Sequence, residues 1–343
     1  MDTKKRVRRG VIVVALLALL TGGYLWHHEG TPAVRLANFC DGVLPVDEML
    51  RVTGTNANGF SGGRLGSLHT NEFRNTGELG TVCSINKPGA FRVSIEAMED
   101  SKPFATYVSP HGGEVLPIPL GNSWSGFLAP SEKALSGSVV LDCPGWREGQ
   151  GKGILVTGAW GNVNGYAPEI HKRLAKIITT AAERTAEQTA CKAELGTPVN
   201  RIDRAVTKAK EADRATGTCE GVDSQRTVLE TAASTAPVEY CILKDGLRLS
   251  ALYGEFAGSD FGGFEGEGPD DLRGENKSTF WGTAQCSGGL QYAQFTAAAE
   301  QEGEREGFSE RPPTAQEYAD LRTFAERSAG RHGCKNLTLP PKG

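Results

Sequence analysis

The sequence predicts an α+β fold that occurs twice, behind one N-terminal membrane segment. Three observations predict it. Eight cysteines recur at matched intervals, and the intervals Cys143 to Cys191 and Cys286 to Cys334 are both 48 residues. Short runs near the cysteines alternate apolar and polar residues, as half-buried antiparallel strands do. A long stretch with apolar residues at helical spacing closes each half of the chain.

The N-terminus predicts export through a membrane. Residues 1–9 are basic, and residues 10–26 are an uncharged, mostly apolar run of 17 residues, near the lower limit for a membrane-spanning helix. Because basic flanks stay in the cytoplasm, we expect a single-pass protein of the cytoplasmic membrane with its N-terminus inside. Residues 27–39 are then an extracytoplasmic spacer. A cleaved signal peptide is the alternative.

Charge restricts the partners of the exported part. The whole chain carries −4 and residues 1–10 carry +4, so the remainder carries −8. An acidic chain repels phosphate backbones, so we expect no nucleic acid as partner. The expected partners are a small molecule or protein of the cell envelope, and the membrane through residues 10–26. We expect no cofactor and no metal.

All eight cysteines follow the apolar segment, which is typical of disulfides in an oxidising compartment. A zinc site would need closely paired cysteines, and the nearest two here are 22 residues apart. Redox switching is a further alternative to structural bonds. Within each half we expect the first cysteine to pair with the second and the third with the fourth. The expected bonds are Cys40–Cys83, Cys143–Cys191, Cys219–Cys241 and Cys286–Cys334.

Repeated text indicates a duplication. "AERTAEQTACK" at 182–192 matches "AERSAGRHGCK" at 325–335, and "CDGV" at 40–43 matches "CEGV" at 219–222. A repeat of this length is a domain. We therefore expect domains at 40–191 and 219–335, followed by a tail at 336–343. The segment 192–218 is polar and charged, and we interpret it as a solvated, partly helical linker.

The elements of the first domain are predicted from local patterns. "LPVDEMLRVTG" at 44–54 predicts a helix that ends at Gly54, and "SQRTVLETAAS" at 224–234 is its expected counterpart. Lys87-Pro88-Gly89 predicts a turn before a strand at 91–95. Residues 136–143 and 153–160 predict two more strands. Apolar residues from Ile170 to Ala182 predict the closing helix.

The second domain shows the same order. Lys244-Asp245-Gly246 predicts the turn, and residues 279–286 and 290–297 predict strands. Thr314 to Glu317 forms a capping box, in which the threonine and glutamate satisfy free backbone N–H groups at a helix start. Tyr318, Leu321 and Ala325 supply the apolar stripe, and Gly333 ends this helix.

With this layout the chain resembles a group of uncharacterised actinobacterial, Streptomyces-type membrane-anchored extracytoplasmic proteins. The likeness rests on the cysteine-containing opening of each half, on "LPIPLGNSWSGFLAP…SVVLDCPG" at 116–145 and on the closing helix. The opening is also similar to actinobacterial lipoprotein domains, from which this chain departs by lacking a lipobox cysteine. The resemblance implies a fold and a location. It implies no activity, because fold does not carry function.

Gly59-Phe60-Ser61-Gly62-Gly63 fits the G-x-S-x-G pattern of a serine nucleophile. Such a nucleophile needs a preceding apolar strand and a following helix, and neither flank provides one. Cys40 to Cys83 spans 43 residues whereas Cys219 to Cys241 spans 22, so Ser61 lies in an insertion of one copy. We interpret the motif as a loop. The candidate partners of a catalytic serine are His27, His28, His69, His111, His171 and His332.

Other candidates favour structural interpretations. Residues 254–276 are acidic and glycine-rich, but they lack the calcium-loop spacing and predict a solvated loop. Trp124, Trp146 and Trp160 could line a pocket, although core packing is the commoner role. Asp47 and Glu48 fit ordinary first-turn helix acids. His27 and His28 fit a spacer beside the membrane.

These observations predict a membrane-tethered, non-enzymatic binding or protein-interaction module with no catalytic residues. The alternative is a secreted serine hydrolase that uses Ser61 on peptide or cell-wall substrates. A purely structural envelope protein is a third hypothesis.

Overall fold

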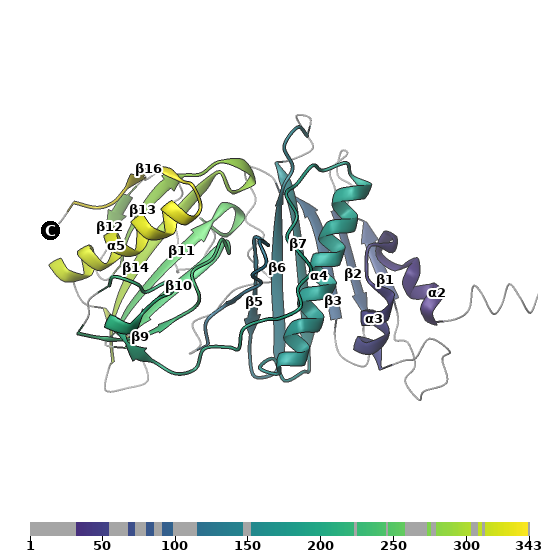
Figure 1. Ribbon diagram of the computed structural model, residues 1–343, viewed down its shortest axis with the longest axis horizontal. Helices are drawn as coiled ribbons and strands as arrows, with labels where there is room; N and C mark the ends of the chain where they lie inside the picture. Colours follow the sequence, from purple (N-terminus) through teal and green to yellow (C-terminus); the bar gives the residue numbers. More distant parts are fainter. Residues whose placement is uncertain are drawn as a thin grey trace, which may run out of the picture.

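The computed structural model describes residues 32–54, 68–72, 80–85, 91–98, 115–146, 152–222, 225–244, 246–257, 273–275, 279–302, 308–310 and 313–341. These residues form an α+β structure with two antiparallel sheets and four disulfides, as predicted. Each sheet carries one long helix (Figure 1).

The first sheet has the strand order β1-β2-β3-β7-β6-β5-β4. Its strands are β1 (Leu68–Glu72), β2 (Gly80–Ile85), β3 (Phe91–Ala97), β4 (Ile118–Pro119), β5 (Gly126–Pro130), β6 (Ala134–Asp142) and β7 (Gly153–Gly161). Three short helices precede it, namely α2 (Pro32–Ala37), η1 (Phe39–Gly42) and α3 (Val46–Thr53). The long helix α4 (Pro168–Gln188) follows it.

The second sheet has the order β12-β13-β14-β11-β10-β9-β8, with β15 paired to β14 and β16 paired to β13. Its strands are β8 (Lys210–Glu211), β9 (Thr227–Glu230), β10 (Val238–Leu243), β11 (Leu247–Tyr253), β12 (Arg273–Glu275), β13 (Thr279–Gln285), β14 (Tyr292–Glu302), β15 (Phe308–Glu310) and β16 (Lys335–Thr338). Its helices are η3 (Ala212–Arg214), η4 (Gly254–Phe256), η5 (Gly288–Leu290) and α5 (Ala315–Arg331).

The two sheets share one connectivity. The path β1-β2-β3-β7-β6-β5 in the first has the same chain order as β9-β10-β11-β14-β13-β12 in the second. The second cysteine of each half lies on an equivalent strand, Cys83 on β2 and Cys241 on β10. An internal duplication requires this correspondence.

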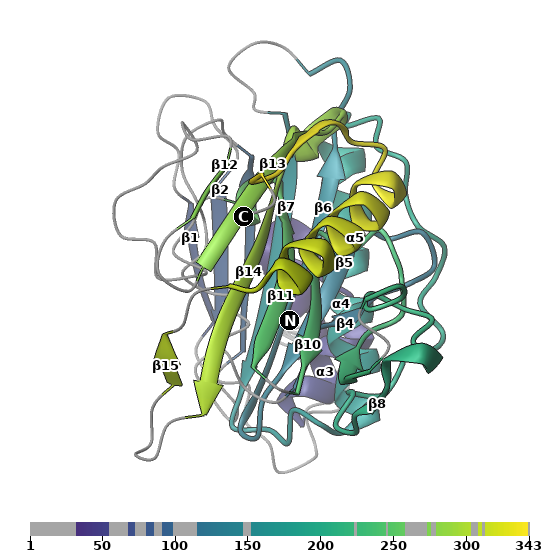
Figure 2. The same cartoon turned by 90° about the vertical axis from the view of Figure 1, so that its left-hand side faces the viewer.

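The sheets pack face to face, with a helix on each outer face (Figures 1 and 2). Helix α4 packs across β6 and β7, and α5 contacts β11 and β14. Because side chains alternate along a strand, Val139 enters the core under α4 while Val140 enters the cluster between the sheets. There Phe127 and Phe256 meet edge to face, with ring centroids 5.4 Å apart. The order of layers is therefore helix, sheet, sheet, helix.

Most of the elements that local patterns predicted are present. Helix α3 ends at Gly54, whose φ of +66° fits the left-handed cap. Both hydrogen bonds of the capping box between Thr314 and Glu317 are present. The amide of Gly246 donates to Leu243 across the second predicted turn, whereas the first, at 87–89, lies outside the described residues.

The helix expected at 224–234 is wrong. Residues Thr227–Glu230 form strand β9, which pairs with β10 through Cys241–Leu243. Val228 is buried in the core under α5, and Leu229 in the cluster between the sheets. A strand that presents apolar side chains to both faces buries more of this segment than a one-sided helix, so packing decides the conformation.

The linker expected at 192–218 is exposed along most of its length, as predicted, but its helical part is limited to the short η3. Residues 192–209 have no regular secondary structure, and only the short β8 and η3 follow. Val199 is buried in the core under α4, and Ala212 and Ala215 in the core under α5. The few apolar side chains are spaced so that different ones reach different cores. The segment is therefore a strap that packs on both sheet units.

The four disulfides join the expected cysteines. Cys40–Cys83 links η1 to β2, and Cys219–Cys241 links the end of the strap to β10. Cys143–Cys191 and Cys286–Cys334 each link the residue after a central strand to the chain just beyond a long helix. Four intact bonds indicate an oxidising environment.

The predicted membrane segment, residues 10–26, lies outside the described residues. Among the helices that the structure describes, none has the length and apolar character needed to cross a membrane.

Candidate functional site

A cleft of about 660 Å³ opens where the strap crosses the two sheet units. Four elements contribute to it: edge strand β4, the first residue of α4, the strap and the chain just after β9. Its lining residues are Ile118, Pro119, Pro168, Arg201, Ile202, Asp203, Arg204, Val206, Thr231 and Ala232. Cavities of this size accept a small organic molecule, and such sites favour the junction of two structural units.

The strap is fixed at one end by the turn before β5. The indole nitrogen of Trp124 donates to the carbonyl of Thr197 at 2.9 Å, and the Asn122 side chain donates to the carbonyl of Pro198 at 3.0 Å. The amide of Thr197 donates back to Asn122 at 2.9 Å. Gly196 lies so close that a Cβ there would be 2.4 Å from Trp124 Cδ1. Glycine is therefore required at this contact.

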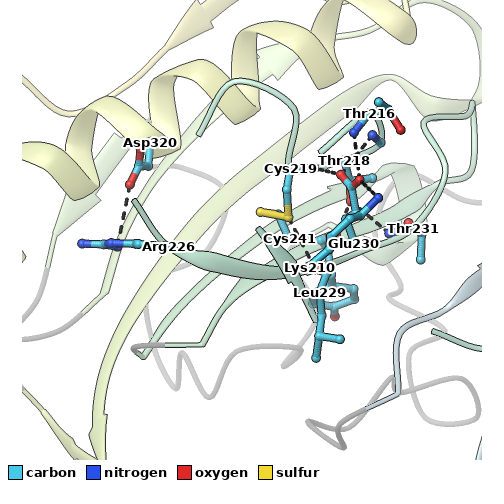
Figure 3. Close-up of a disulfide and its surroundings, with 12 residues drawn as sticks. Lys210, Thr216, Thr218, Cys219, Arg226, Leu229, Glu230, Thr231, Cys241 and Asp320 are labelled. Carbon is cyan, nitrogen blue, oxygen red and sulfur yellow. Dashed lines mark hydrogen bonds and ion pairs between the residues drawn. A yellow bond between two sulfur atoms is a disulfide. The ribbon is translucent and has the colours of Figure 1, made fainter. Parts of the chain in front are cut away.

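The other end of the strap is fixed by the buried carboxylate of Glu230 (Figure 3). It accepts hydrogen bonds from the amides of Thr216, Gly217 and Cys219 at 2.9–3.0 Å. Lys210 Nζ lies 2.5 Å from its Oε1. Three backbone donors and one ammonium group compensate the burial of this carboxylate, which would otherwise be costly.

The same anchor positions the wall of the cleft. The amide of Thr218 donates to the carbonyl of Thr231 at 3.0 Å, and the amide of Thr231 donates to the Thr218 hydroxyl at 3.3 Å. A Cβ at Gly217 would lie 2.0 Å from the Thr231 carbonyl oxygen. Thr231 and Ala232, which line the cleft, therefore directly follow the fixed point.

The strap contributes three charged side chains to the lining of the cleft, and we call this part of the strap, residues 201–206, the roof. Arg201, Asp203 and Arg204 are exposed and line the cleft. The structure gives none of them an ion-pair partner among the residues that it describes. The roof therefore offers two guanidinium groups and one carboxylate above a mainly apolar lining.

A second polar cluster is buried between α5 and its sheet. Glu239 accepts from Ser328 Oγ at 2.8 Å and from the Arg331 guanidinium, and its other oxygen lies 3.2 Å from His332 Nε2. The Tyr253 hydroxyl bonds to Ser328 at 2.6 Å, and its ring stacks on His332 at 3.7 Å. Burial raises the pKa of the Glu239 carboxyl, but His332 and Arg331 outweigh burial and hold that pKa below its usual value.

This cluster does not have the geometry of a hydrolase. Its serine is hydrogen-bonded to the carboxylate and the tyrosine, whereas a nucleophilic serine must be bonded to the histidine that removes its proton. Ser328 is fully buried and His332 has a side chain only 1% exposed, so no substrate reaches them. The cluster fixes the end of α5 to the sheet.

The residues predicted from the sequence lie apart. Ser61, His27, His28 and His111 lie outside the described residues, as does most of 254–276, and nothing is described of the His69 side chain. His171 is buried at the start of α4 and bonded to the Gly165 carbonyl at 2.6 Å, whereas His332 caps α5 on the other sheet. No group of metal-ligating side chains gathers anywhere in the described ranges.

The tryptophans fill the core. Trp124 and Trp160 are buried there, and Trp146 is partly buried against it. Glu48 is more than a first-turn acid, because it is buried and paired with Lys176 at 2.9 Å and Arg51 at 3.0 Å. Sequence reasoning missed the cleft and Glu230. The available signal was Glu230 itself, which directly follows the apolar residues Val228 and Leu229. An acid that is buried beside such residues needs hydrogen-bond or ion-pair partners.

Comparison with protein families, with curated proteins and with solved structures gave no match.

Proposed function

We propose that the protein is a non-enzymatic, membrane-tethered extracytoplasmic binding module whose ligand occupies the cleft under residues 201–206. The observation that carries this proposal is the strap, which is fixed at Trp124 and at Glu230 and roofs a cleft between these anchors. A site that is already ordered loses less conformational entropy on binding, so its contacts convert more fully into affinity.

The location rests on two supports. Four disulfides indicate an oxidising compartment. The basic residues 1–9 and the apolar run 10–26 supply the tether in this proposal, as they do in the envelope proteins that the chain resembles. The matched topologies of the two sheets support a duplicated domain. In this proposal the ligand site lies at the junction between the two copies.

The chemistry of the lining favours binding over catalysis. Among the ten lining residues the polar groups are two guanidiniums, one exposed carboxylate and one threonine hydroxyl. A guanidinium stays protonated in proteins and serves as a donor, not as a general base. The lining pairs no nucleophile with a base, which is the arrangement that nucleophilic catalysis needs.

Native mass spectrometry of the full detergent-solubilised chain, exported into an oxidising compartment, tests this proposal. Ala232→Trp fills the cleft from an exposed position, and Ala233→Trp is the matched control, because Ala233 is exposed but does not line the cleft. We expect a non-covalent extra mass in the wild type and in Ala233→Trp, and its loss in Ala232→Trp. An extra mass that survives Ala232→Trp, or a bare wild type, contradicts the proposal.

A further inference from the structure

We infer that the cleft binds an amphipathic monoanion, in which one carboxylate or phosphate-type head is attached to an apolar body. This inference rests on the proposed function and adds the chemical class of the ligand. It follows from the charges of the roof, from their spacing along the strap and from the apolar remainder of the lining.

The head is recognised by Arg201 and Arg204. Both line the cleft, and neither has an ion-pair partner among the described residues. A guanidinium is planar and presents paired donors that match the two oxygens of a carboxylate or phosphate. Two such groups on one short segment, in a chain of net charge −4, form a local cationic site in an otherwise acidic protein.

Asp203 limits the number of negative charges that a ligand of this site can carry. It lies between the two arginines in sequence and lines the same cleft. Its carboxylate leaves the three charged roof residues with a net charge of +1. A second negative charge on the ligand is repelled by Asp203, so the site favours a monoanion over a dianion.

The body of the ligand meets apolar side chains. Six of the ten lining residues are apolar: Ile118, Pro119, Pro168, Ile202, Val206 and Ala232. Small inorganic anions leave this surface exposed to water, whereas an alkyl or aromatic body covers it and gains the hydrophobic contribution. The cavity of about 660 Å³ has room for such a body beside the charged head.

Three probes with the same alkyl tail and different heads separate the contribution of the charged head from that of the apolar body. They are decanoate, decanol and decyltrimethylammonium. Calorimetric titration of the full chain gives their Kd values. We expect decanoate to bind most tightly. Arg201→Gln with Arg204→Gln should raise its Kd about tenfold or more, because two charge-assisted hydrogen bonds are lost. Asp203→Asn should leave that Kd unchanged or lower it, and Ala233→Trp is the control.

Calorimetric titration with dihexanoyl-phosphatidylglycerol, a short-chain lipid that stays monomeric below its critical micelle concentration, distinguishes a lipid headgroup from a free amphiphile as the source of the anion. Binding of either decanoate or this lipid that depends on both arginines supports the inference. The inference is overturned if decanol binds as tightly as decanoate, if decyltrimethylammonium binds more tightly, or if the arginine changes leave the Kd of decanoate unaltered. If Ala232→Trp still abolishes the binding of the probe in such a case, the proposed function stands although the inference fails. If neither anionic source binds, the inference fails, and the extra mass in native mass spectrometry decides the proposed function separately.

Discussion

Glu230 and Lys210 form an ion pair at 2.5 Å across the end of the strap, and the same carboxylate accepts three backbone amides. The Lys210 side chain is 41% exposed, whereas the Glu230 side chain is 2% exposed. The pair is therefore asymmetric. Most of the stabilisation comes from the backbone donors, since an exposed ammonium is screened by water.

Glu230→Gln tests this anchor. The amide keeps the shape but removes the charge and turns one acceptor into a donor that faces backbone N–H groups. We expect the free energy of unfolding to fall by about 1.5–3 kcal/mol, the range for hydrogen bonds to a charged group. Urea denaturation measures it. Glu220→Gln is the matched control, because Glu220 pairs with Arg327 at the surface and should change stability by less than about 1 kcal/mol. Equal losses in both variants would contradict the role of the anchor.

His171 predicts a loss of stability in mild acid. Burial lowers the pKa of its imidazole, although the hydrogen bond to the Gly165 carbonyl partly opposes this, and its Nδ1 has no hydrogen-bond partner among the residues that the structure describes. Because the folded pKa lies below the unfolded value of 6.5, the unfolded chain binds the proton more tightly. Stability is therefore full above that value and falls as the pH decreases through and below it.

Urea denaturation of the wild type and of His171→Gln between pH 8 and pH 5 checks this. We expect the wild type to lose stability over this range and the variant, although weaker at pH 8, to lose less. A variant with the same slope as the wild type would show that the acid sensitivity does not arise at His171.

Local sequence patterns were sufficient for the parts of the fold that depend on local chemistry. The stripe from Ile170 to Ala182, the capping box at Thr314 and the equal 48-residue cysteine intervals each predicted what the structure contains. Each of these signals depends on residues within a few turns or on a distance along the chain.

The cleft depends on contacts that no local pattern contains. The sequence of residues 227–230 is compatible with a helix or with a strand. Pairing with β10 and burial on both faces select the strand. Val199, Val206 and Ala212 are too far apart to form a periodic pattern, yet each packs into a different apolar cluster. The strap therefore resembled a linker in sequence.

Glu239→Gln tests the cluster beneath α5. The change leaves the partly exposed Arg331 guanidinium beside a neutral amide. Removing one partner of a fully buried pair costs about 3–5 kcal/mol, so we expect a loss of stability no greater than this range. Because the folded pKa of Glu239 is lowered, the wild type also loses this contribution as the pH falls below the usual value of 4.5 toward the folded one. Thermal unfolding at pH 7 and pH 4 measures both effects. A variant as stable as the wild type at pH 7 would show that the cluster does not hold α5.

The two bonds of equal loop length give a matched pair of stability changes. Cys143–Cys191 and Cys286–Cys334 each close a loop with a separation of 48 residues, for which the chain-entropy model gives about 4 kcal/mol. Replacing both cysteines of either bond with serine should lower the free energy of unfolding by about this amount.

Helix α5 is also fixed to its sheet by Glu239, whereas the end of α4 is held to the η1 region by Arg184 and Gln188 near the surface. The Cys143 and Cys191 double variant should therefore show the larger increase in amide hydrogen exchange at the C-terminal end of its helix. Greater exchange at the end of α5 than at the end of α4 would contradict this assignment of the contacts.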